Sequence, residues 1–181
     1  MAAVSRPILF SLLLISGLCC FSCGRPSKGQ VLEQWETGNG AFKLRAEAFA
    51  EKNGGFVPGA YYVFSSAPNG AGTWRTVMTF RHDDTVPIPR QQLRIMSKNF
   101  AYIFMGWMYA VTTDGGMTWT VWDARKDLPN WQCCNYGLIQ DVNVRPDGTG
   151  EMILSPIPGR RGEVPSVCTA DFGRNWASKC G

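Results

Sequence analysis

Short apolar runs separated by clusters of Gly, Pro, Asn and Asp dominate the chain after residue 60. The runs are rich in aromatic and β-branched residues, a composition that predicts β-strands bounded by tight turns. The strands predicted in this way cover residues 60–66, 73–81, 100–105, 107–112, 118–123, 138–144 and 150–154.

Residues 41–52 admit either a helix or a strand. Apolar residues take the even positions from Phe42 to Ala48, and charged residues take the odd positions between them. A strict period of two is typical of a half-buried strand, so a strand is favoured.

An octet occurs twice in the second half of the chain. Residues 112–119 read TTDGGMTW and residues 169–176 read TADFGRNW, and a degraded third copy over residues 65–74 ends at Trp74. The shared positions are Thr112, Asp114, Gly116 and Trp119 in one copy and Thr169, Asp171, Gly173 and Trp176 in the other. The three Trp residues are 45 and 57 positions apart, a spacing close to one sheet of a repeat protein.

Each residue type in the octet suits a hairpin turn. The Asp carboxylate can accept hydrogen bonds from amides of its own turn, the Gly can supply a positive φ, and the Trp can fold over the turn. A calcium loop is the rival interpretation, but one carboxylate per turn falls far short of the roughly six to eight oxygen ligands that calcium takes. We therefore expect the octets to be structural.

The octets resemble the Asp-box, or bacterial neuraminidase repeat, family. That resemblance implies β-propeller blades, and a complete propeller needs more blades than this chain can supply. We therefore expect an all-β fold, either a small twisted β-sandwich or a partial propeller built of antiparallel hairpins, with three repeat units.

The N-terminus has the order of a secretory signal. Arg6 precedes an apolar stretch over residues 8–21, and small and polar residues follow it. The stretch is shorter than the roughly 20 residues that span a bilayer, so we predict a signal helix over residues 1–23 rather than a permanent anchor. Residues 24–40 are predicted to be a linker, and residues 41–181 a single all-β domain.

Cys23 follows the small residue Ser22 at the end of this segment. The pattern resembles a bacterial lipoprotein signal, which implies that Cys23 is acylated and that the protein lies in the periplasm, anchored to the outer membrane. Four later cysteines are disulfide candidates, because an exported chain meets an oxidising compartment. They are Cys133, Cys134, Cys168 and Cys180, and the pairing stays open.

Composition argues against several classes of function. Without residues 1–23 the net charge falls from +4 to +3, because Arg6 is lost, and the basic residues are scattered, so no nucleic-acid partner is expected. The single histidine, His82, lies far from the cysteines, so we expect no metal site and no cofactor. Neither a G-x-S-x-G motif nor the arginine cluster of a sialidase can be identified, so we expect no enzyme.

A second resemblance covers residues 107–176, including the stretches 130–154 and 159–176. These look like the lipase-immunity proteins of type VI secretion systems, which implies a periplasmic lipoprotein that binds and neutralises a secreted phospholipase toxin. The candidate binding residues are Arg160, Arg161 and Glu163 in the proline-bounded loop 156–165, with Trp131 as a second candidate. The alternatives are an ordinary solvated loop and a core Trp, and for the whole protein a non-catalytic glycan- or cell-wall-binding module or a sialidase-like glycosidase.

Overall fold

The computed structural model describes residues 28–51, 59–68, 72–127, 138–155 and 165–178, which form eleven strands and two short helices. The strands are β1 Lys28–Gly38, β2 Phe42–Glu51, β3 Ala60–Pro68, β4 Arg75–His82, β5 Leu93–Ile95, β6 Ala101–Met105, β7 Met108–Thr112, β8 Thr120–Asp123, β9 Ile139–Val144, β10 Gly150–Leu154 and β11 Ser166–Thr169. The helices are η1 Arg90–Gln92 and α1 Ala124–Asp127.

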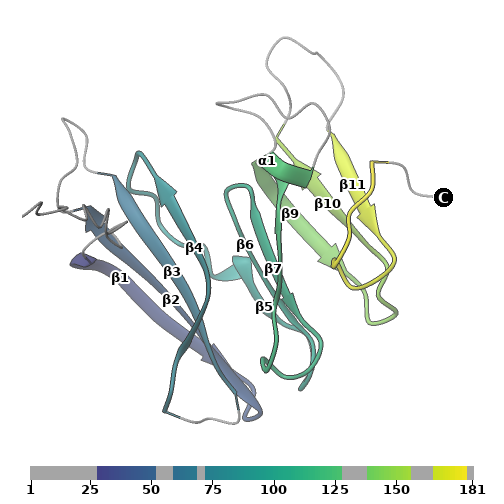
Figure 1. The fold of residues 1–181 in the computed structure, drawn as a ribbon, viewed down its shortest axis with the longest axis horizontal. Helices are drawn as coiled ribbons and strands as arrows, with labels where there is room; N and C mark the ends of the chain where they lie inside the picture. Colours follow the sequence, from purple (N-terminus) through teal and green to yellow (C-terminus); the bar gives the residue numbers. More distant parts are fainter. Residues whose placement is uncertain (1–27, 52–58, 69–71, 128–137, 156–164, 179–181) are drawn as a thin grey trace, which may run out of the picture.

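Three antiparallel sheets stand side by side (Figure 1). We call β1–β4 the first sheet, β5–β8 the middle sheet and β9–β11 the third sheet. In each sheet the strands are hydrogen-bonded in the order in which they follow one another along the chain. The all-β expectation is confirmed, and the described residues form three antiparallel meandering sheets.

The hydrophobic pattern of each strand matches the position of its sheet in the row. In β2 of the first sheet buried residues alternate with charged ones, because only one face of the sheet is covered. Strand β6 of the middle sheet is buried at every position, because both of its faces are covered. A continuous apolar run therefore marks the middle layer, and an alternating run marks an outer layer.

Two hydrophobic cores fill the spaces between the sheets. Ile103 and Met105 point toward the first sheet, where they pack with Phe64 and other residues of β2 and β3. Tyr102 and Phe104, the alternate residues of the same strand, point toward the third sheet. The two outer sheets thus each bury an apolar face against the middle sheet, and the middle sheet buries both of its faces.

The three octets occupy the same place in each sheet. The degraded copy lies between β3 and β4, and residues 112–119 connect β7 to β8. Residues 169–176 follow β11, and a single bridge between Cys168 and Ala177 marks where a fourth strand would begin. The repeat seen in the sequence therefore corresponds to a repeat of sheets. In each sheet the octet follows the third strand.

Some elements differ from the prediction. The predicted linker over residues 24–40 is wrong for residues 28–38, which form strand β1. This strand pairs along its length with β2, but its apolar residues Val31 and Leu32 are 48% and 44% exposed, so it lacks the alternation that marks a buried strand. Strands β5 and β11 were not predicted, because three or four residues are too few to show a period. The predicted signal helix lies outside the described residues.

Octet glycines stand where neighbouring sheets come closest. Gly173 has a φ of +84°, and a Cβ atom there would overlap the ring and hydroxyl of Tyr109 in the middle sheet. Gly116 has a φ of +82°, and a Cβ atom there would lie 3.3 Å from the Phe42 ring in the first sheet. Glycine is needed at both positions for backbone conformation and for the space between sheets.

We predict that Gly173→Ala costs clearly more stability than Gly40→Ala. Gly40 has a φ of +83° but open space around its Cβ position, so its substitution carries only the strain of the left-handed backbone, about 1–2 kcal/mol. Gly173→Ala adds the displacement of Tyr109, expected to cost about a further 1–3 kcal/mol. Urea unfolding of the two variants measures the difference, and equal losses would contradict the close approach of the sheets.

Candidate functional site

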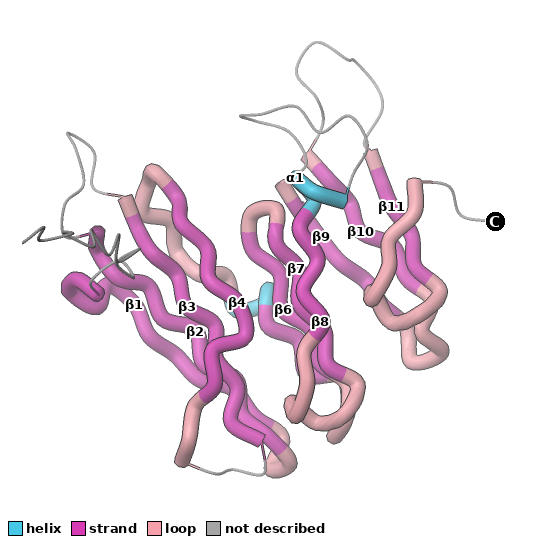
Figure 2. The backbone as a smooth tube through the Cα atoms, in the orientation of Figure 1, coloured by secondary structure: helices cyan, strands magenta, loops and turns pink. Residues whose placement is uncertain are grey.

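The row of sheets has two ends with different connections. At one end lie the octets and the short turns β1–β2, β5–β6 and β9–β10, and we call this end the Asp-box rim. At the other end lie the β6–β7 turn, α1 and the described residues Glu51, Leu138 and Ser155, and we call it the loop rim (Figure 2). Antiparallel meanders impose this alternation, because successive connections leave a sheet at opposite ends.

The first octet closes a hydrogen-bond network within its own turn. The Thr112 hydroxyl donates to Asp114 Oδ1 at 2.8 Å and accepts from the Gly116 amide at 3.0 Å. The Thr118 amide donates to the same carboxylate at 3.0 Å, and the Thr118 hydroxyl donates to Oδ2. Both carboxylate oxygens of Asp114 are therefore engaged locally.

The second octet repeats this network. The Thr169 hydroxyl donates to Asp171 Oδ1 at 2.7 Å and accepts from the Gly173 amide at 2.9 Å. Asn175 takes the place of Thr118, with its amide at 3.0 Å from Oδ1 and its side-chain Nδ2 at 2.6 Å from Oδ2. One local sequence pattern thus gives one turn geometry at two places in the chain.

These hydrogen bonds decide the charge state of the two acids. Burial by itself would raise the pKa of Asp114 and of Asp171, but the donors of each turn outweigh it and hold the pKa below its usual value. Both groups are carboxylates at neutral pH with their oxygens already hydrogen-bonded. Neither is arranged to exchange a proton with a substrate near pH 7.

The indoles of the octets reach the neighbouring sheet. Trp119 packs into the core between the first and middle sheets, and its Nε1 donates to Ser66 Oγ of the first sheet at 3.0 Å. Trp176 packs edge-on against Tyr109 of the middle sheet, with ring centroids 5.3 Å apart. Each indole contacts the preceding sheet, because the space between two sheets needs a large apolar side chain.

Four arginines of the described residues each pair with their own acids. The ion pairs are Arg45 with Glu36, Arg81 with Glu51 and Asp83, Arg94 with Asp141, and Arg125 with Asp123. Arg45 and Arg81 lie in strands of the first sheet, Arg94 lies in the middle sheet, and Arg125 follows β8, so these four guanidinium groups are each held by different acids. A shallow pocket of about 350 Å³ lies beside the β1–β2 turn, between Glu36 and Lys43. No group of three metal-ligating side chains occurs among the described residues.

The loop rim carries an aromatic side chain at the tip of a hairpin. Gly106, with a φ of +59°, and Trp107 form the two-residue turn between β6 and β7, and glycine at its first position is what this turn type requires. Half-buried Trp107 packs against Phe80 with ring centroids 4.7 Å apart. The Arg125 guanidinium lies 4.5 Å from the centroid of Trp107. An aromatic ring and a guanidinium therefore share the surface of this rim.

Arg125 is held in place by Asp123. Its Nη2 lies 2.7 Å from Asp123 Oδ2 and its Nε lies 2.9 Å from Oδ1, a two-pronged pair that fixes the guanidinium plane. Burial would raise the pKa of Asp123, but the hydrogen bonds and charge of Arg125 lower it overall. The side chain of Arg125 is still 44% exposed, so it remains open to a partner.

The residues that flank segments 128–137 and 156–164 are hydrogen-bonded to each other and to this turn. The Leu138 amide donates to Ser155 Oγ at 3.1 Å and the Ser155 amide donates to the Leu138 carbonyl at 2.8 Å, which joins the end of 128–137 to the start of 156–164. The Ile139 amide also donates to the Gly106 carbonyl. The roots of both connections are therefore fixed next to Trp107.

The binding residues predicted from sequence belong to these connections. Trp131, Arg160, Arg161 and Glu163 lie outside the described residues, as do Cys23, Cys133, Cys134 and Cys180. Cys168 in β11 is disulfide-bonded, and the pairing of the cysteines stays a prediction. Sequence reasoning did not single out Trp107 or Arg125. The available signal was Gly-Trp between two strands, which marks a turn with an exposed aromatic tip.

Compared with known proteins, the chain matches no family model, no curated protein and no solved structure. Within the described residues no helix has the length and apolar character needed to cross a membrane. The function proposed below therefore depends on the geometry of the two rims.

We predict that Asp171→Asn lowers the free energy of unfolding at pH 7 by about 1.5–3 kcal/mol, the scale of hydrogen bonds to a charged group. Because the pKa of Asp171 is lower in the folded state than the ordinary 3.8, its contribution is complete above that value and is lost as the pH falls through the folded-state pKa. The difference between variant and parent should therefore shrink below pH 4.

Asp83→Asn is the matched control, because Asp83 has an 88% exposed side chain and an ion pair of 3.3 Å. We expect it to change stability by less than about 0.5 kcal/mol. Urea unfolding from pH 7 to pH 3 measures both variants. A loss of unfolding free energy for Asp171→Asn no larger than that for Asp83→Asn would contradict the structural role of the octet acid.

Proposed function

We propose that the protein is an exported binding protein of the bacterial envelope, which recognises and neutralises a secreted antibacterial phospholipase and has no catalytic activity of its own. The proposal combines the resemblance of residues 107–176 to lipase-immunity proteins with the surface of the loop rim. The observation that carries it is the joining of the roots of 128–137 and 156–164 next to the Trp107–Arg125 pair.

A rigid base under binding loops supports this function. Binding costs less when the contacting groups are already held in place. The loop rim meets this condition where it is described, since Arg125 is fixed by Asp123 and the Gly106 carbonyl accepts from Ile139. Trp and Arg are the side chains that most often dominate protein interfaces. We infer that Arg160, Arg161 and Glu163, which follow Ser155 in the sequence, contribute to the same interface.

The state of the acids favours binding over turnover. Asp114 and Asp171 are engaged by their own turns, and four arginines of the described residues are each paired with their own acids. A glycosidase requires two carboxyl groups that face one substrate, whereas both oxygens of Asp114 and of Asp171 are already hydrogen-bonded within their own turns. Recognition through a surface is the function that this geometry supports best.

We predict that the double variant Arg160→Glu/Arg161→Glu binds the toxin at least about ten-fold more weakly, because it reverses two cations in the proposed interface. The probe is a secreted phospholipase encoded by a gene next to that of this protein, inactivated at its nucleophile, and the lack of such a gene would count against the immunity function. Binding is measured by calorimetry, and protection is measured as survival of cells that export the active lipase.

The matched control is Lys98→Glu/Arg174→Glu, which makes the same change in charge on the Asp-box rim. We expect this variant to bind and protect like the parent chain. Equal losses in both variants would place the interface elsewhere. If an envelope pull-down with the parent chain recovers only peptidoglycan or glycan, the immunity function is wrong and a wall-binding module takes its place.

A further inference from the structure

The guanidinium of Arg125 has one occupied edge and one open edge. Its Nε and Nη2 donate to the two oxygens of Asp123, at 2.9 Å and 2.7 Å. These are its only side-chain hydrogen bonds to the described residues, although a guanidinium carries further N–H donors on Nη1 and on the outer side of Nη2. The side chain is 44% exposed. The edge formed by Nη1 and Nη2 is therefore available to another molecule.

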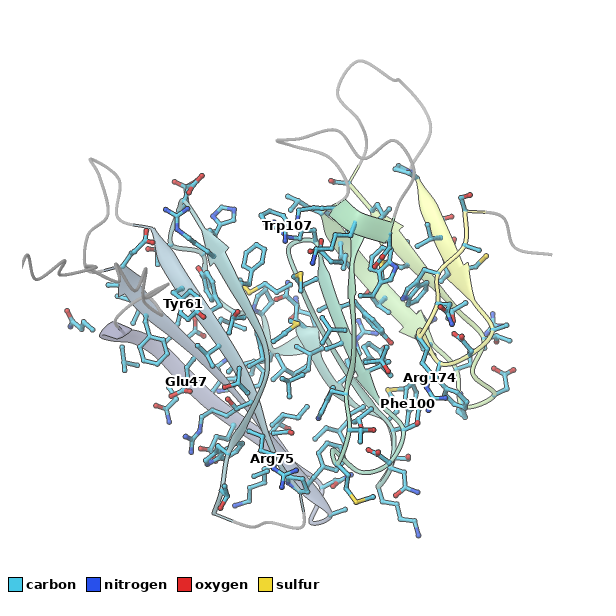
Figure 3. All side chains as sticks on the ribbon, in the orientation of Figure 1. Glu47, Tyr61, Arg75, Phe100, Trp107 and Arg174 are labelled. Atoms are coloured by element: carbon cyan, nitrogen blue, oxygen red, sulfur yellow. The ribbon has the colours of Figure 1, made fainter. Side chains whose placement is uncertain are left out.

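Trp107 supports this guanidinium from a second direction. The Arg125 Cζ atom lies 4.5 Å from the centroid of the indole, within the range of a cation–π contact. The indole is itself held by an edge-on contact with Phe80, with ring centroids 4.7 Å apart. Figure 3 labels Trp107 at this rim and Arg75 and Arg174 toward the opposite end. The open edge of Arg125 is thus held in place before any partner binds.

The other ion-paired arginines are less open to an added partner. Arg81, near the end of β4, is 58% exposed, but all three of its side-chain nitrogens donate to acids. The three side-chain nitrogens of Arg94 are engaged as well. Arg45 stacks on Trp74, but its side chain is only 24% exposed. Of the four ion-paired arginines in the described residues, Arg125 has the most accessible open edge.

A partner that covers Trp107 must supply an acceptor to this edge. Water satisfies the free N–H groups of Arg125 while the rim is exposed, and an interface that removes this water leaves them unpaired unless an acceptor replaces it. The donors of Nη1 and Nη2 lie side by side in one plane, a geometry that the two oxygens of a carboxylate match. A neutral carbonyl has a single oxygen and satisfies only part of the edge.

The charges around Arg125 favour a carboxylate over a phosphate. The exposed ammonium of Lys126 is the next residue of α1, and Asp123 and Asp127 balance the two cations. A phosphate group carries about −1.5 to −2 charge at pH 7. In surroundings that are balanced, a ligand with a single negative charge meets less repulsion from the two acids than a phosphate does.

We propose that the Trp107–Arg125 pair is a carboxylate-binding site, which takes an acidic side chain of a partner protein on the open edge of Arg125. Naming the toxin as that partner rests on the proposed function, whereas the carboxylate chemistry rests on the geometry of Arg125. Lysine cannot replace arginine here, because an ammonium keeps the charge but has no planar edge with paired donors.

The site is tested first on the full chain without the toxin. Propionate is titrated while the NMR signals of Arg125 Nε–H and Trp107 Nε1–H are followed, with propionamide, sodium chloride and inorganic phosphate as parallel titrants. We expect both signals to shift along a saturating curve with propionate. Propionamide and chloride should cause only small shifts without saturation, and phosphate should bind more weakly than propionate.

A second test uses the catalytically inactive phospholipase of the proposed function. Arg125→Lys should weaken its binding at least about ten-fold, the scale of hydrogen bonds to a charged group. Arg81→Lys is the matched control, because Arg81 is more exposed but has its three nitrogens engaged, and it should bind within about two-fold of the parent chain. Both variants keep their charge, and the NMR spectrum of each shows whether the fold is retained.

Three results would overturn the proposal. The first is a parent chain whose two signals show no saturating shift with propionate, and the second is phosphate binding as tight as that of propionate. The third is toxin binding by Arg125→Lys that equals that of Arg81→Lys. If propionate saturates the site of a parent chain that binds no phospholipase, the proposed function is wrong and the carboxylate site stands. The two proposals therefore fail separately.

Discussion

Each sheet of this protein has an apolar face that only the neighbouring sheet can cover, and this need for mutual cover governs the rest of the structure. A small antiparallel sheet is not stable with its apolar face in water. The middle sheet has two apolar faces, and each is covered by a neighbouring sheet, since Ile103 lies in one core and Tyr102 in the other. The sheets must therefore approach closely and stay in register.

The octet secures that register at each junction. Its acid and hydroxyl close the turn, its glycine lets the turn lie against an aromatic ring of the preceding sheet, and its indole enters the core between the two sheets. The indole nitrogen of Trp119 has a hydrogen-bond partner in Ser66, whereas that of Trp176 has none among the described residues. Apolar packing against the preceding sheet is thus the feature that both copies share.

Local patterns were sufficient to predict the longer strands with buried side chains but not the short strands β5 and β11, and the alternation from Phe42 to Ala48 was correctly assigned to a strand. Strand β1 was missed because its pairing is made by the backbone while its side chains are largely exposed. The octet turn could be foreseen because Asp114 and Thr118 are four residues apart. The contact of Trp119 with Ser66 could not, since it joins residues 53 apart through the packing of two sheets.

The candidate binding surface also depends on a contact that the sequence alone could not predict. Trp107 and Arg125 come together because one lies in a hairpin turn and the other follows β8 at the same end of the middle sheet. Nothing in their sequence spacing predicts a contact.

A double-mutant cycle on Ser66→Ala and Trp119→Phe tests most directly whether the octet joins one sheet to the next. The two side chains belong to different sheets and meet through one hydrogen bond of 3.0 Å. The account predicts a coupling free energy of about 0.5–1.5 kcal/mol in urea unfolding at pH 7, with each single variant less stable than the parent. Additive losses, with coupling indistinguishable from zero, would contradict it.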